Sequence, residues 1–468
     1  MKKKMKALFP LLLVVVFIVS LAACSGGSDS GGKSGDAPAA DTGTENTQAA
    51  NTEETKTEPA NDAGGEKVTI TFAWWGDAKR HEKYNAIADL YEKENPYVKI
   101  ERQYGSFNDY WDKLATQTAG GNAPDVQGMH ATYVADYAQR GALLDLEPYL
   151  ADGTIDIGSF PDSVKEVQKV EGKTVMIAQG VTMTGWNYNK GALDKLGVAA
   201  PDYNWTWDDF LAKVAEIQKA INASDNKKRW ASVDASGDIT GVQVYARQKG
   251  TDLFTAEGKL GVTKEQMTEW FAMWDKLRKD KVIPDAATSE QYATVSLDQG
   301  MLVKGLVILA TFPFNQIPLY QNYIADGEVQ PLRRPLDPSG KEGEFVEGAY
   351  LAVAKTSKYP KEAADFISFF VNNEEVQKIF KLEQGALGST KGNEVIRPTL
   401  NPAEQRTLEA IETSLKTAGK LPLPPKGQGE VRTLLTETSQ AVAFGQLSPE
   451  QGAQEFVEKA AEILAKSS

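Results

Sequence analysis

A strand that leads directly into a helix, near residue 68, most constrains what this chain can fold into. The segment Val68–Asp77 (VTITFAWWGD) mixes threonines with apolar residues and ends in glycine and aspartate. β-branched and aromatic residues over that length predict a buried strand. A helical pattern follows, so we expect the first strand of a strand–helix–strand series, an arrangement that favours a parallel sheet.

Trp74, Trp75 and Asp77 stand at the carboxyl end of this strand. Parallel sheets bind ligands just beyond that end of their strands. A flat apolar ring beside a polar acceptor suits a sugar, whose C–H face stacks while its hydroxyl groups need hydrogen bonds. The alternative is that Trp74 belongs to the core and only Trp75 faces outward.

Length and charge narrow the class of protein. A chain of 468 residues is too long for one ordinary domain and predicts two. The net charge of −13 argues against a nucleic-acid-binding protein, which needs a basic surface to replace counterions. Two histidines and one cysteine leave no material for a His/Cys metal site, so we expect neither metal nor cofactor; a cation held by carboxylates stays open.

Residues 1–23 have the composition of an export signal. Four lysines within the first six residues precede an apolar run, Leu8–Leu21, that is short for a bilayer span. The small residues Ala22 and Ala23 and then Cys24, the one cysteine of the chain, follow. Residues 24–66 are mostly small, polar or acidic and cannot bury enough surface to offset the entropy of ordering. We therefore expect them to form a disordered stalk.

The remaining chain alternates strand and helix signals before it becomes more helical after residue 205. Thr206-x-x-Asp209 and Thr263-x-x-Gln266 have the form of capping boxes. A stripe on the second of these helices (Met267, Trp270, Phe271, Trp274, Leu277) predicts a core-facing side. Ser448, with Gln451 three residues later, predicts the start of the last helix. Helices are expected at 80–95, 106–120, 132–140, 361–382 (one long helix), 402–418, 430–444 and 449–465, and strands at 97–104, just after the turn 121–126, and at 173–178, 184–189, 302–312 and 345–354.

Several blocks resemble a known family, the extracellular solute-binding proteins of carbohydrate ABC importers (the maltose-binding-like class). Residues 123–126 (APDV) followed by 139–146 (QRGALLDL) are similar to its APD…GxLLDL signature. Residues 186–190 (WNYNK) followed by 205–209 (WTWDD) are similar to its YNK…TWDD block. Leu421-Pro422 and the helices after it resemble the carboxyl-terminal module. The resemblance extends over nearly all of residues 67–464.

The resemblance implies an α/β fold of two lobes, each a mostly parallel sheet flanked by helices, with the ligand cleft between them. Lobe one would take residues 67–178 plus 348–390, and lobe two 179–347 plus 391–468. The chain would cross near residues 178–180 and 346–348, where glycines suit hinges. Leu21-Ala22-Ala23-Cys24 resembles the lipobox of bacterial lipoproteins, which implies cleavage before Cys24 and a diacylglycerol on its sulfur.

The cleft residues that the resemblance implies lie at strand ends and helix starts. Trp75, Phe314 and Tyr350 would be aromatic platforms; the alternative for each is the core of a lobe. The polar anchors would be Asp77, His130, Asp234 and Asn315; the alternative for the acids is a helix N-cap or a solvated loop. Trp186 would be either an extra stacking ring or core. The full set is Trp74, Trp75, Asp77, His81, Tyr104, Phe107, His130, Thr182, Trp186, Asp234, Ser236, Asp238, Phe314, Asn315 and Tyr350.

The implied function is binding without catalysis. A lipid-anchored monomer on the extracellular face of a Gram-positive type membrane would bind a sugar and deliver it to ABC permease subunits by lobe closure. ATP would be hydrolysed by other subunits, because this chain has no GxxxxGK[ST] loop. A surface glycoside hydrolase that uses two carboxylates, or a sensing or adhesive lipoprotein, are the alternatives. Lys79, Arg80 and His81 would favour an acidic sugar unless they only form an exposed basic helix start.

Overall fold

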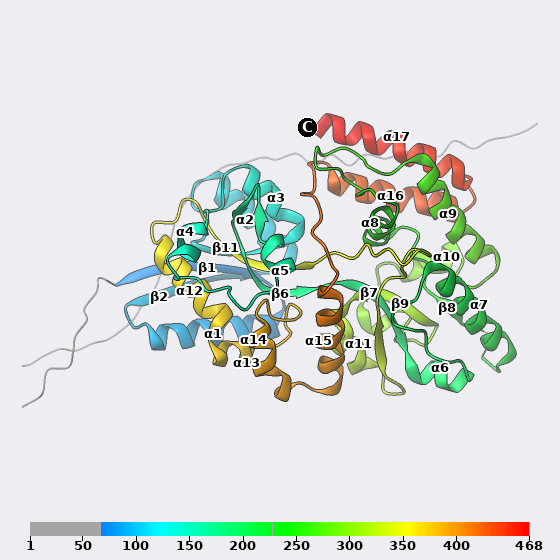
Figure 1. Ribbon diagram of the computed structural model, residues 1–468, viewed down its shortest axis with the longest axis horizontal. Coiled ribbons are helices and arrows are strands. Elements are labelled where there is room, and N and C mark those ends of the chain that lie inside the picture. The colour runs from blue at the N-terminus through cyan, green and yellow to red at the C-terminus, as the bar shows by residue number, and fades with distance from the viewer. Residues whose placement is uncertain (1–66, 227, 468) are drawn as a thin grey trace, which may run out of the picture. The chain divides into compact units, whose positions relative to one another are not determined.

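The computed structural model describes residues 67–226 and 228–467, which contain two main β-sheets. The predicted export signal, Cys24 and the predicted stalk at 24–66 lie outside the described residues. The mixed α/β fold class that the sequence predicts is confirmed, with helices flanking both sheets (Figure 1).

The first sheet has five strands, in the order β2 (Val98–Gly105), β1 (Val68–Trp75), β3 (Val126–His130), β11 (Glu347–Val353) and β6 (Ile177–Thr182). Strand β1 pairs in parallel with both β2 and β3. Strand β11 is antiparallel to both of its neighbours, β3 and β6. β11 is therefore the one strand of this sheet that runs against the others.

The second sheet has four strands, in the order β10 (Val329–Leu332), β7 (Thr184–Asn189), β9 (Val307–Pro313) and β8 (Trp230–Ser232). Strand β7 is antiparallel to β10 and β9, whereas β8 and β9 are parallel. Each sheet thus contains a single reversed strand, and its other strands run in the same direction, as expected of mostly parallel sheets. A short hairpin, β4 (Lys169–Val170) with β5 (Lys173–Thr174), is separate from both sheets.

The predicted helices are all present, with one correction. The expected long helix at 361–382 is two helices, α12 (Pro360–Asn372) and α13 (Glu374–Phe380). They are separated at Asn373, whose side chain accepts from the backbone N–H groups of Glu375 (2.9 Å) and Val376 (3.2 Å). Asn373 therefore ends one helix and caps the next.

The other helices, in chain order, are α1 (Ala78–Glu94), α2 (Phe107–Ala119), α3 (Ala131–Gln139), α4 (Glu147–Ala151), α5 (Asp162–Val167), α6 (Lys190–Leu196), α7 (Trp207–Ala223), α8 (Ile239–Gln248), α9 (Lys264–Lys279), α10 (Ala286–Tyr292), α11 (Ile317–Tyr323), α14 (Thr390–Ile396), α15 (Pro402–Leu415), α16 (Gln428–Ala443) and α17 (Pro449–Ser467), with short 3-10 helices η1 (Leu297–Gln299), η2 (Phe314–Gln316) and η3 (Arg397–Thr399). Of these helices, α4, α5, α6, α8, α10, α11 and α14 were not predicted. The predicted capping boxes before α7 and α9 are both present. Ser448 caps α17 as predicted, since its Oγ accepts from the N–H of Gln451 at 3.2 Å.

Helices cover both faces of the first sheet. Figure 1 shows α1 on one side of β1 and α2 and α3 on the other. Successive residues of a strand point to opposite faces, so Phe72 lies against Tyr84 of α1 and Phe366 of α12, with ring centroids 5.8 and 5.0 Å away. Trp75 of the same strand points to the opposite face and lies against Tyr110 of α2, with ring centroids 5.5 Å apart. Both faces of β1 are therefore core.

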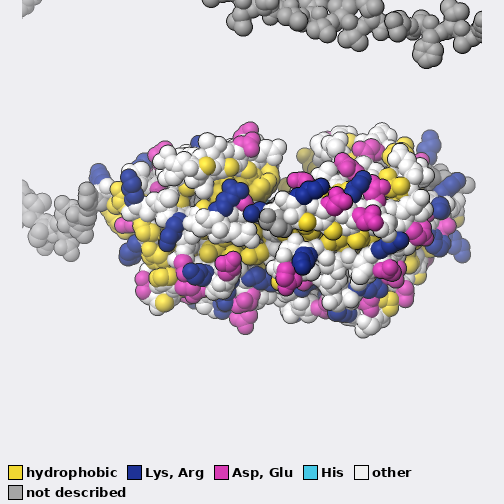
Figure 2. Space-filling model, turned by 90° about the horizontal axis from the view of Figure 1, so that it is seen from above, with side chains coloured by type: hydrophobic (Ala, Val, Ile, Leu, Met, Phe, Trp, Pro, Cys, Tyr) yellow, Lys and Arg dark blue, Asp and Glu magenta, His cyan; other side chains and the backbone are white. Residues whose placement is uncertain are grey.

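The second sheet has a separate core, built around the predicted stripe of α9. Met267, Trp270, Phe271 and Trp274 are all at most 1% exposed, which confirms their assignment to the core. α9 packs against α17, and α17 against α16. The described residues on the face drawn in Figure 2 form no single acidic patch. Basic and acidic side chains are interspersed there among hydrophobic ones.

The chain passes from the first sheet to the second through one residue, Met183, which joins β6 to β7. The predicted crossing at 178–180 lies within β6, and the one at 346–348 includes the first two residues of β11. Glu347 of β11 pairs with Thr182, and Thr184 of β7 pairs with Pro313. The two sheets therefore meet at Thr182–Thr184.

Candidate functional site

The strand ends of both sheets converge on this meeting point. In the first sheet β3 ends at His130 and β6 at Thr182, and in the second β9 ends at Pro313. The loop after β8 carries Asp234–Asp238 into the first turn of α8. Most of the predicted site residues belong to these strand ends or to the turns that follow them, as the rule for ligand sites in α/β sheets predicts.

The tryptophan pair at the end of β1 is buried, which corrects the expectation that Trp75 faces outward. Trp74 is 1% exposed and Trp75 is 6% exposed. The two rings lie on opposite faces of the sheet, and Trp75 covers Gly128 so closely that a Cβ there would lie 3.0 Å from the ring. Trp75 also contacts Trp111, with ring centroids 5.6 Å apart. Both indoles are core residues beneath the site.

Exposed aromatic rings at this edge come from Tyr104 and Phe107 instead. Tyr104 is 49% exposed and lies against His81, with the ring planes tilted by 31° and the centroids 4.3 Å apart. Phe107 is 39% exposed and lies edge-on to His130 at 6.0 Å. His81 accepts a hydrogen bond from Trp74 Nε1 at 3.1 Å, which holds it in place. These rings give the first sheet a stacking surface that solvent can reach.

The other predicted platforms are interior. Phe314 is fully buried and packs against Gly185, where a Cβ would lie 2.4 Å from the ring. Tyr350 is 1% exposed. Trp186 is fully buried between Phe210 and Trp274, with centroids at 5.1 and 6.4 Å. The structure therefore places Trp186 in the second core and not on an accessible surface.

The predicted acids all have structural partners, and for Asp77 and Asp238 the partner is a helix N-terminus, the alternative stated for the acids. Asp77 is the exposed N-cap of α1 and accepts from the N–H of Arg80 at 3.0 Å. Asp238 is the N-cap of α8. Asp234 pairs with buried Arg278 and accepts from the N–H of Ser236 at 2.9 Å. These carboxylates shape the turns around the site.

The remaining predicted residues lie at the same edge. Thr182 is buried, and its Oγ1 accepts from the N–H of Asn315 at 3.3 Å, which links β6 to the turn after β9. Ser236 is buried, and its hydroxyl lies 2.5 Å from that of Ser439 on α16. Arg80 is paired with an acid of the same region, since its Nε donates to Glu383 at 2.9 Å.

A polar network at the sheet junction was not predicted. Arg334, just after β10, is 1% exposed and donates to Asp238 Oδ2 (2.6 Å), to the Thr184 carbonyl (3.0 Å) and to Thr311 Oγ1 (3.2 Å). Thr184 Oγ1 in turn donates to Glu347 Oε2 at 2.6 Å. Burial raises the pKa of Glu347 above that of a free glutamate. The network fixes both strand ends where the sheets meet.

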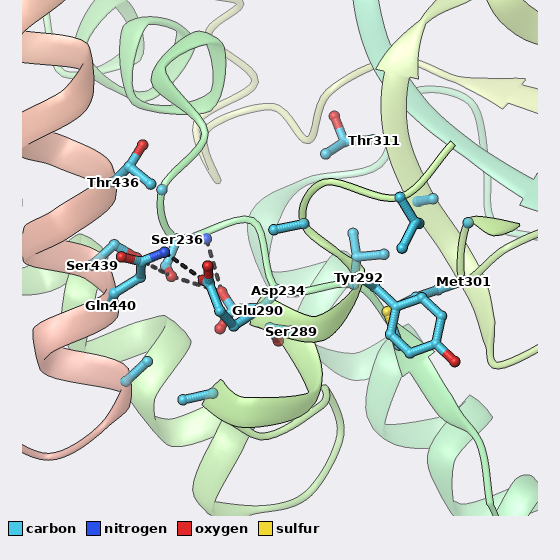
Figure 3. Close-up of a pocket in the computed structure, with 18 of the residues that line it drawn as sticks. Asp234, Ser236, Ser289, Glu290, Tyr292, Met301, Thr311, Thr436, Ser439 and Gln440 are labelled. Carbon is cyan, nitrogen blue, oxygen red and sulfur yellow. Dashed lines mark hydrogen bonds between the residues drawn. The ribbon is translucent and has the colours of Figure 1, made fainter. Parts of the chain in front are cut away.

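A cavity of about 440 Å³ opens beside the second sheet (Figure 3). We call it the serine-rich cavity. Glu290 and Gln440 lie together on one side, with Gln440 Nε2 donating to Glu290 at 2.5 Å, and Tyr292 and Met301 lie on another. Its polar lining consists of hydroxyls, amides and carboxylates: Asp234, Ser236, Ser289, Glu290, Ser296, Thr311, Thr436, Ser439 and Gln440. A wall of this kind suits a polyhydroxylated ligand with an apolar face.

A second, smaller cavity of about 130 Å³ lies between the first sheet and helices α8 and α16, and we call it the Arg432 cavity. The first sheet contributes His130 and Tyr350, and α8 contributes Thr240 and Gln243. The polar and charged side chains of its lining are His130, Thr240, Gln243, Glu347, Tyr350, Lys420, Gln428 and Arg432. A ligand in this cavity could contact the end of the first sheet together with helices α8 and α16.

Burial, aided by the nearby charge of Arg432, lowers the pKa of His130 to about 4. A histidine that resists protonation when folded stabilises the protein above its unfolded pKa of about 6.5. This stabilisation is lost as the pH falls from 6.5 toward 4, because only the unfolded chain then binds the proton. We expect His130→Gln to reduce the loss of stability over this pH range by about 2–3 kcal/mol.

Urea unfolding of the wild type and of His130→Gln at pH 7, 6, 5 and 4 measures this difference. The carboxyl groups that titrate in the same range are common to both proteins and cancel in the comparison. Parallel stability curves for the two proteins would contradict the prediction. His81→Gln is the matched control, since the His81 pKa is lowered with much less burial.

Among the described residues, no group of three or more His, Cys, Asp or Glu side chains could hold a metal ion. No helix in that part of the chain is both long and apolar enough to span a membrane.

Comparison with known proteins assigns the chain to a family. The sequence profile of the bacterial extracellular solute-binding proteins matches residues 86–393, which is more than half of the chain. A solved structure of an extracellular solute-binding protein family 1 member from Alicyclobacillus acidocaldarius is 27% identical, covers 86% of this chain and 99% of its own, and superposes with a TM-score of 0.71.

Two further solved structures share the fold. A periplasmic oligogalacturonide-binding protein from Yersinia enterocolitica, in complex with saturated digalacturonic acid, is 20% identical with a TM-score of 0.71, covering 86% of this chain and 99% of its own. An ABC substrate-binding protein from Listeria monocytogenes, in complex with cycloalternan, is 21% identical with a TM-score of 0.70, covering 86% of this chain and all of its own. With the profile match over residues 86–393 and the two-sheet α/β fold in agreement, the chain belongs to the bacterial extracellular solute-binding protein family.

Proposed function

We propose that this protein binds a carbohydrate outside the cytoplasm and delivers it to the permease of an ABC importer. The observation that carries the proposal is the serine-rich cavity, whose lining combines hydroxyl, amide and carboxylate groups with Tyr292 and Met301. Sugar hydroxyls can both donate to and accept from such groups, while an aromatic ring packs against the C–H face. The two neighbours named above as binding oligogalacturonide and cycloalternan support a carbohydrate ligand.

The proposed mechanism divides the described chain into the two predicted lobes, 67–178 plus 348–390 and 179–347 plus 391–468. The Arg432 cavity supports this division, because His130 and Tyr350 of its lining belong to the first predicted lobe, and Thr240, Gln243 and Arg432 to the second. A ligand that contacts both lobes binds the closed arrangement more tightly than the open one and so shifts the population toward closure. The permease would recognise the closed form and receive the sugar unaltered.

The proposed attachment is a lipid anchor. The lipobox-like segment that ends at Cys24 supports a diacylglycerol on that cysteine, and residues 24–66 would form the stalk between membrane and protein. Mass spectrometry of the protein extracted from membranes tests this: the expected product begins at Cys24 and carries the lipid. A Cys24→Ala protein that remained equally membrane-bound would contradict the anchor.

Ligand binding is tested by thermal unfolding with a panel of mono- and oligosaccharides. A ligand that binds only the folded state adds about 2.7 kcal/mol to the free energy of unfolding at 100 times its Kd, so the melting temperature should rise saturably. Chromatography of the recovered sugar should find it intact. Release of shorter products would support the glycoside hydrolase alternative instead.

A matched pair of variants locates the binding site. Thr436 and Thr433 are both exposed on α16, and each donates its hydroxyl to the carbonyl four residues earlier at 3.2 Å. Only Thr436 lines the serine-rich cavity. We expect Thr436→Arg to abolish the sugar-induced shift by filling the cavity, and Thr433→Arg to preserve it. Equal responses in both variants would exclude this cavity as the site.

A further inference from the structure

Two cations in the lining of the Arg432 cavity have no acidic partner. Among the described residues, neither Arg432 nor Lys420 forms an ion pair. The arginines of the neighbouring network differ in this respect: Arg333 is 2.7 Å from Glu344, and Arg334 is 2.6 Å from Asp238. The unmatched positive charge is therefore particular to the cavity and not a general feature of this region.

The one carboxyl group in the cavity lining does not balance these cations. Glu347 receives a hydrogen bond from Thr184 Oγ1 at 2.6 Å and lies within the junction network. Burial raises its pKa, so its carboxyl gives up its proton less readily than a free glutamate. The cavity thus presents two cationic side chains against a carboxyl group whose charged form is disfavoured, and Arg432 is the stronger cation because burial lowers the pKa of Lys420.

Both cations can be reached by a solute. Arg432 is exposed on the first turns of α16, and Lys420 is exposed with its Nζ donating to the Lys169 carbonyl at 2.6 Å. The cavity also contains a buried acceptor without a donor, Gln428 Oε1, which a ligand hydroxyl could satisfy. A ligand that carries both a hydroxyl group and an anionic group would supply partners for Gln428 and for the two cations.

We infer that the ligand is an acidic sugar, whose ring carboxylate is bound by Arg432 with support from Lys420. This inference rests on the proposed carbohydrate function and assigns the charged end of the ligand to the Arg432 cavity, where Arg432 lies one turn of α16 before Thr436 of the serine-rich cavity. A guanidinium matches a carboxylate in two parallel hydrogen bonds, which gives both affinity and orientation. The net charge of −13 does not oppose it, because charges beyond about 8–10 Å are largely screened at physiological salt.

The volume of the cavity agrees with this assignment. At about 130 Å³ it is smaller than the serine-rich cavity of about 440 Å³, so it suits one charged end of a ligand more than a whole oligosaccharide. His130 of β3 and Gln243 of α8, from the two predicted lobes, lie in the same lining. A carboxylate held here would therefore contact both predicted lobes, the condition that ligand-driven closure requires.

Isothermal titration calorimetry of the full chain tests the inference. The ligands are digalacturonate, a disaccharide of glucuronic acid, and the methyl esters of both. Esterification removes only the charge. We expect the acids to bind about 10- to 100-fold more tightly than their esters, with the difference shrinking at high salt. Galactose 6-sulfate and galactose 6-phosphate distinguish other anionic groups; preferential binding of these would overturn the carboxylate assignment.

Variants locate the charge effect. Arg432→Gln should remove most of the preference for acid over ester while leaving ester binding unchanged. Lys426→Gln is the matched control, since Lys426 is exposed in the same segment but lines neither cavity. If esters and acids bind equally, the acidic-sugar inference is wrong and carbohydrate binding stands. If neutral and acidic sugars all fail to bind, both proposals are wrong.

Discussion

Arg334→Met should lower the free energy of unfolding by about 3 kcal/mol, the largest effect we expect from a single change at the sheet junction. The side chain is 1% exposed and donates to Asp238, Thr184 and Thr311. Its removal leaves the Asp238 carboxylate, 21% exposed, without its counter-charge. Because that carboxylate is partly solvated, we expect a loss at the lower end of the range for broken buried pairs. Urea unfolding monitored by circular dichroism measures it.

The double variant Arg334→Met/Asp238→Asn separates the charge effect from lost packing. Asparagine is as good an N-cap as aspartate, so α8 keeps its first hydrogen bond. If the unpaired charge is the main cost, the double variant should be more stable than Arg334→Met alone. If the losses of Arg334→Met and of Asp238→Asn simply add up in the double variant, the two side chains are not energetically coupled. A loss below about 1 kcal/mol in Arg334→Met would contradict the network's role.

Trp75→Ala should lower the free energy of unfolding by about 3–5 kcal/mol, as is typical when a buried tryptophan is truncated. The ring is 6% exposed and packs on Tyr110, Trp111 and Gly128. The cavity left behind cannot collapse easily, since its walls are large aromatic rings and a strand. The melting temperature of the ligand-free protein should therefore drop by several degrees.

Tyr104→Ala is the comparison for this prediction. Tyr104 lies at the end of the neighbouring strand but is 49% exposed, so its truncation should cost less than about 1 kcal/mol while weakening any sugar that stacks on it. An unchanged melting temperature in Trp75→Ala would mean that the ring can be lost without a cavity. It would return Trp75 to the set of accessible ligand-binding residues.

The local features of the fold were predictable because their causes are local. Capping boxes at Thr206 and Thr263 depend on residues three positions apart, and both are present. The apolar stripe of α9 follows from helical spacing alone. The break at Asn373 is also local, yet an apolar run on both sides of it resembled one helix, and the capping side chain was the signal that could have revealed two.

The errors concern burial, which depends on distant parts of the chain. Trp75 looks identical in sequence whether or not Trp111 packs against it, and Trp186 is interior because Phe210 and Trp274 enclose it. The direction of β11 depends on its place between β3 and β6 and not on its composition. Periodicity cannot supply this information.

For the candidate site, the sequence indicated the strand ends but not the charged side chains around them. Arg334 and Glu347 are 13 residues apart and Arg432 is far from both, and none belongs to a recognisable motif. The adjacent pair Arg333-Arg334, directly after a short strand, was the available signal, since two buried cations require partners. Whether the predicted residues contact ligand stays a prediction for the variants above to decide.

The position of β11 has a consequence for biosynthesis. This strand lies between β3 and β6, but it is synthesised only after every strand of the second sheet. Until then β3 and β6 each have an open hydrogen-bonding edge, and open edges pair readily with other chains. A nascent or truncated chain that ends before Glu347 should therefore aggregate or depend on chaperones, however complete its individual helices are.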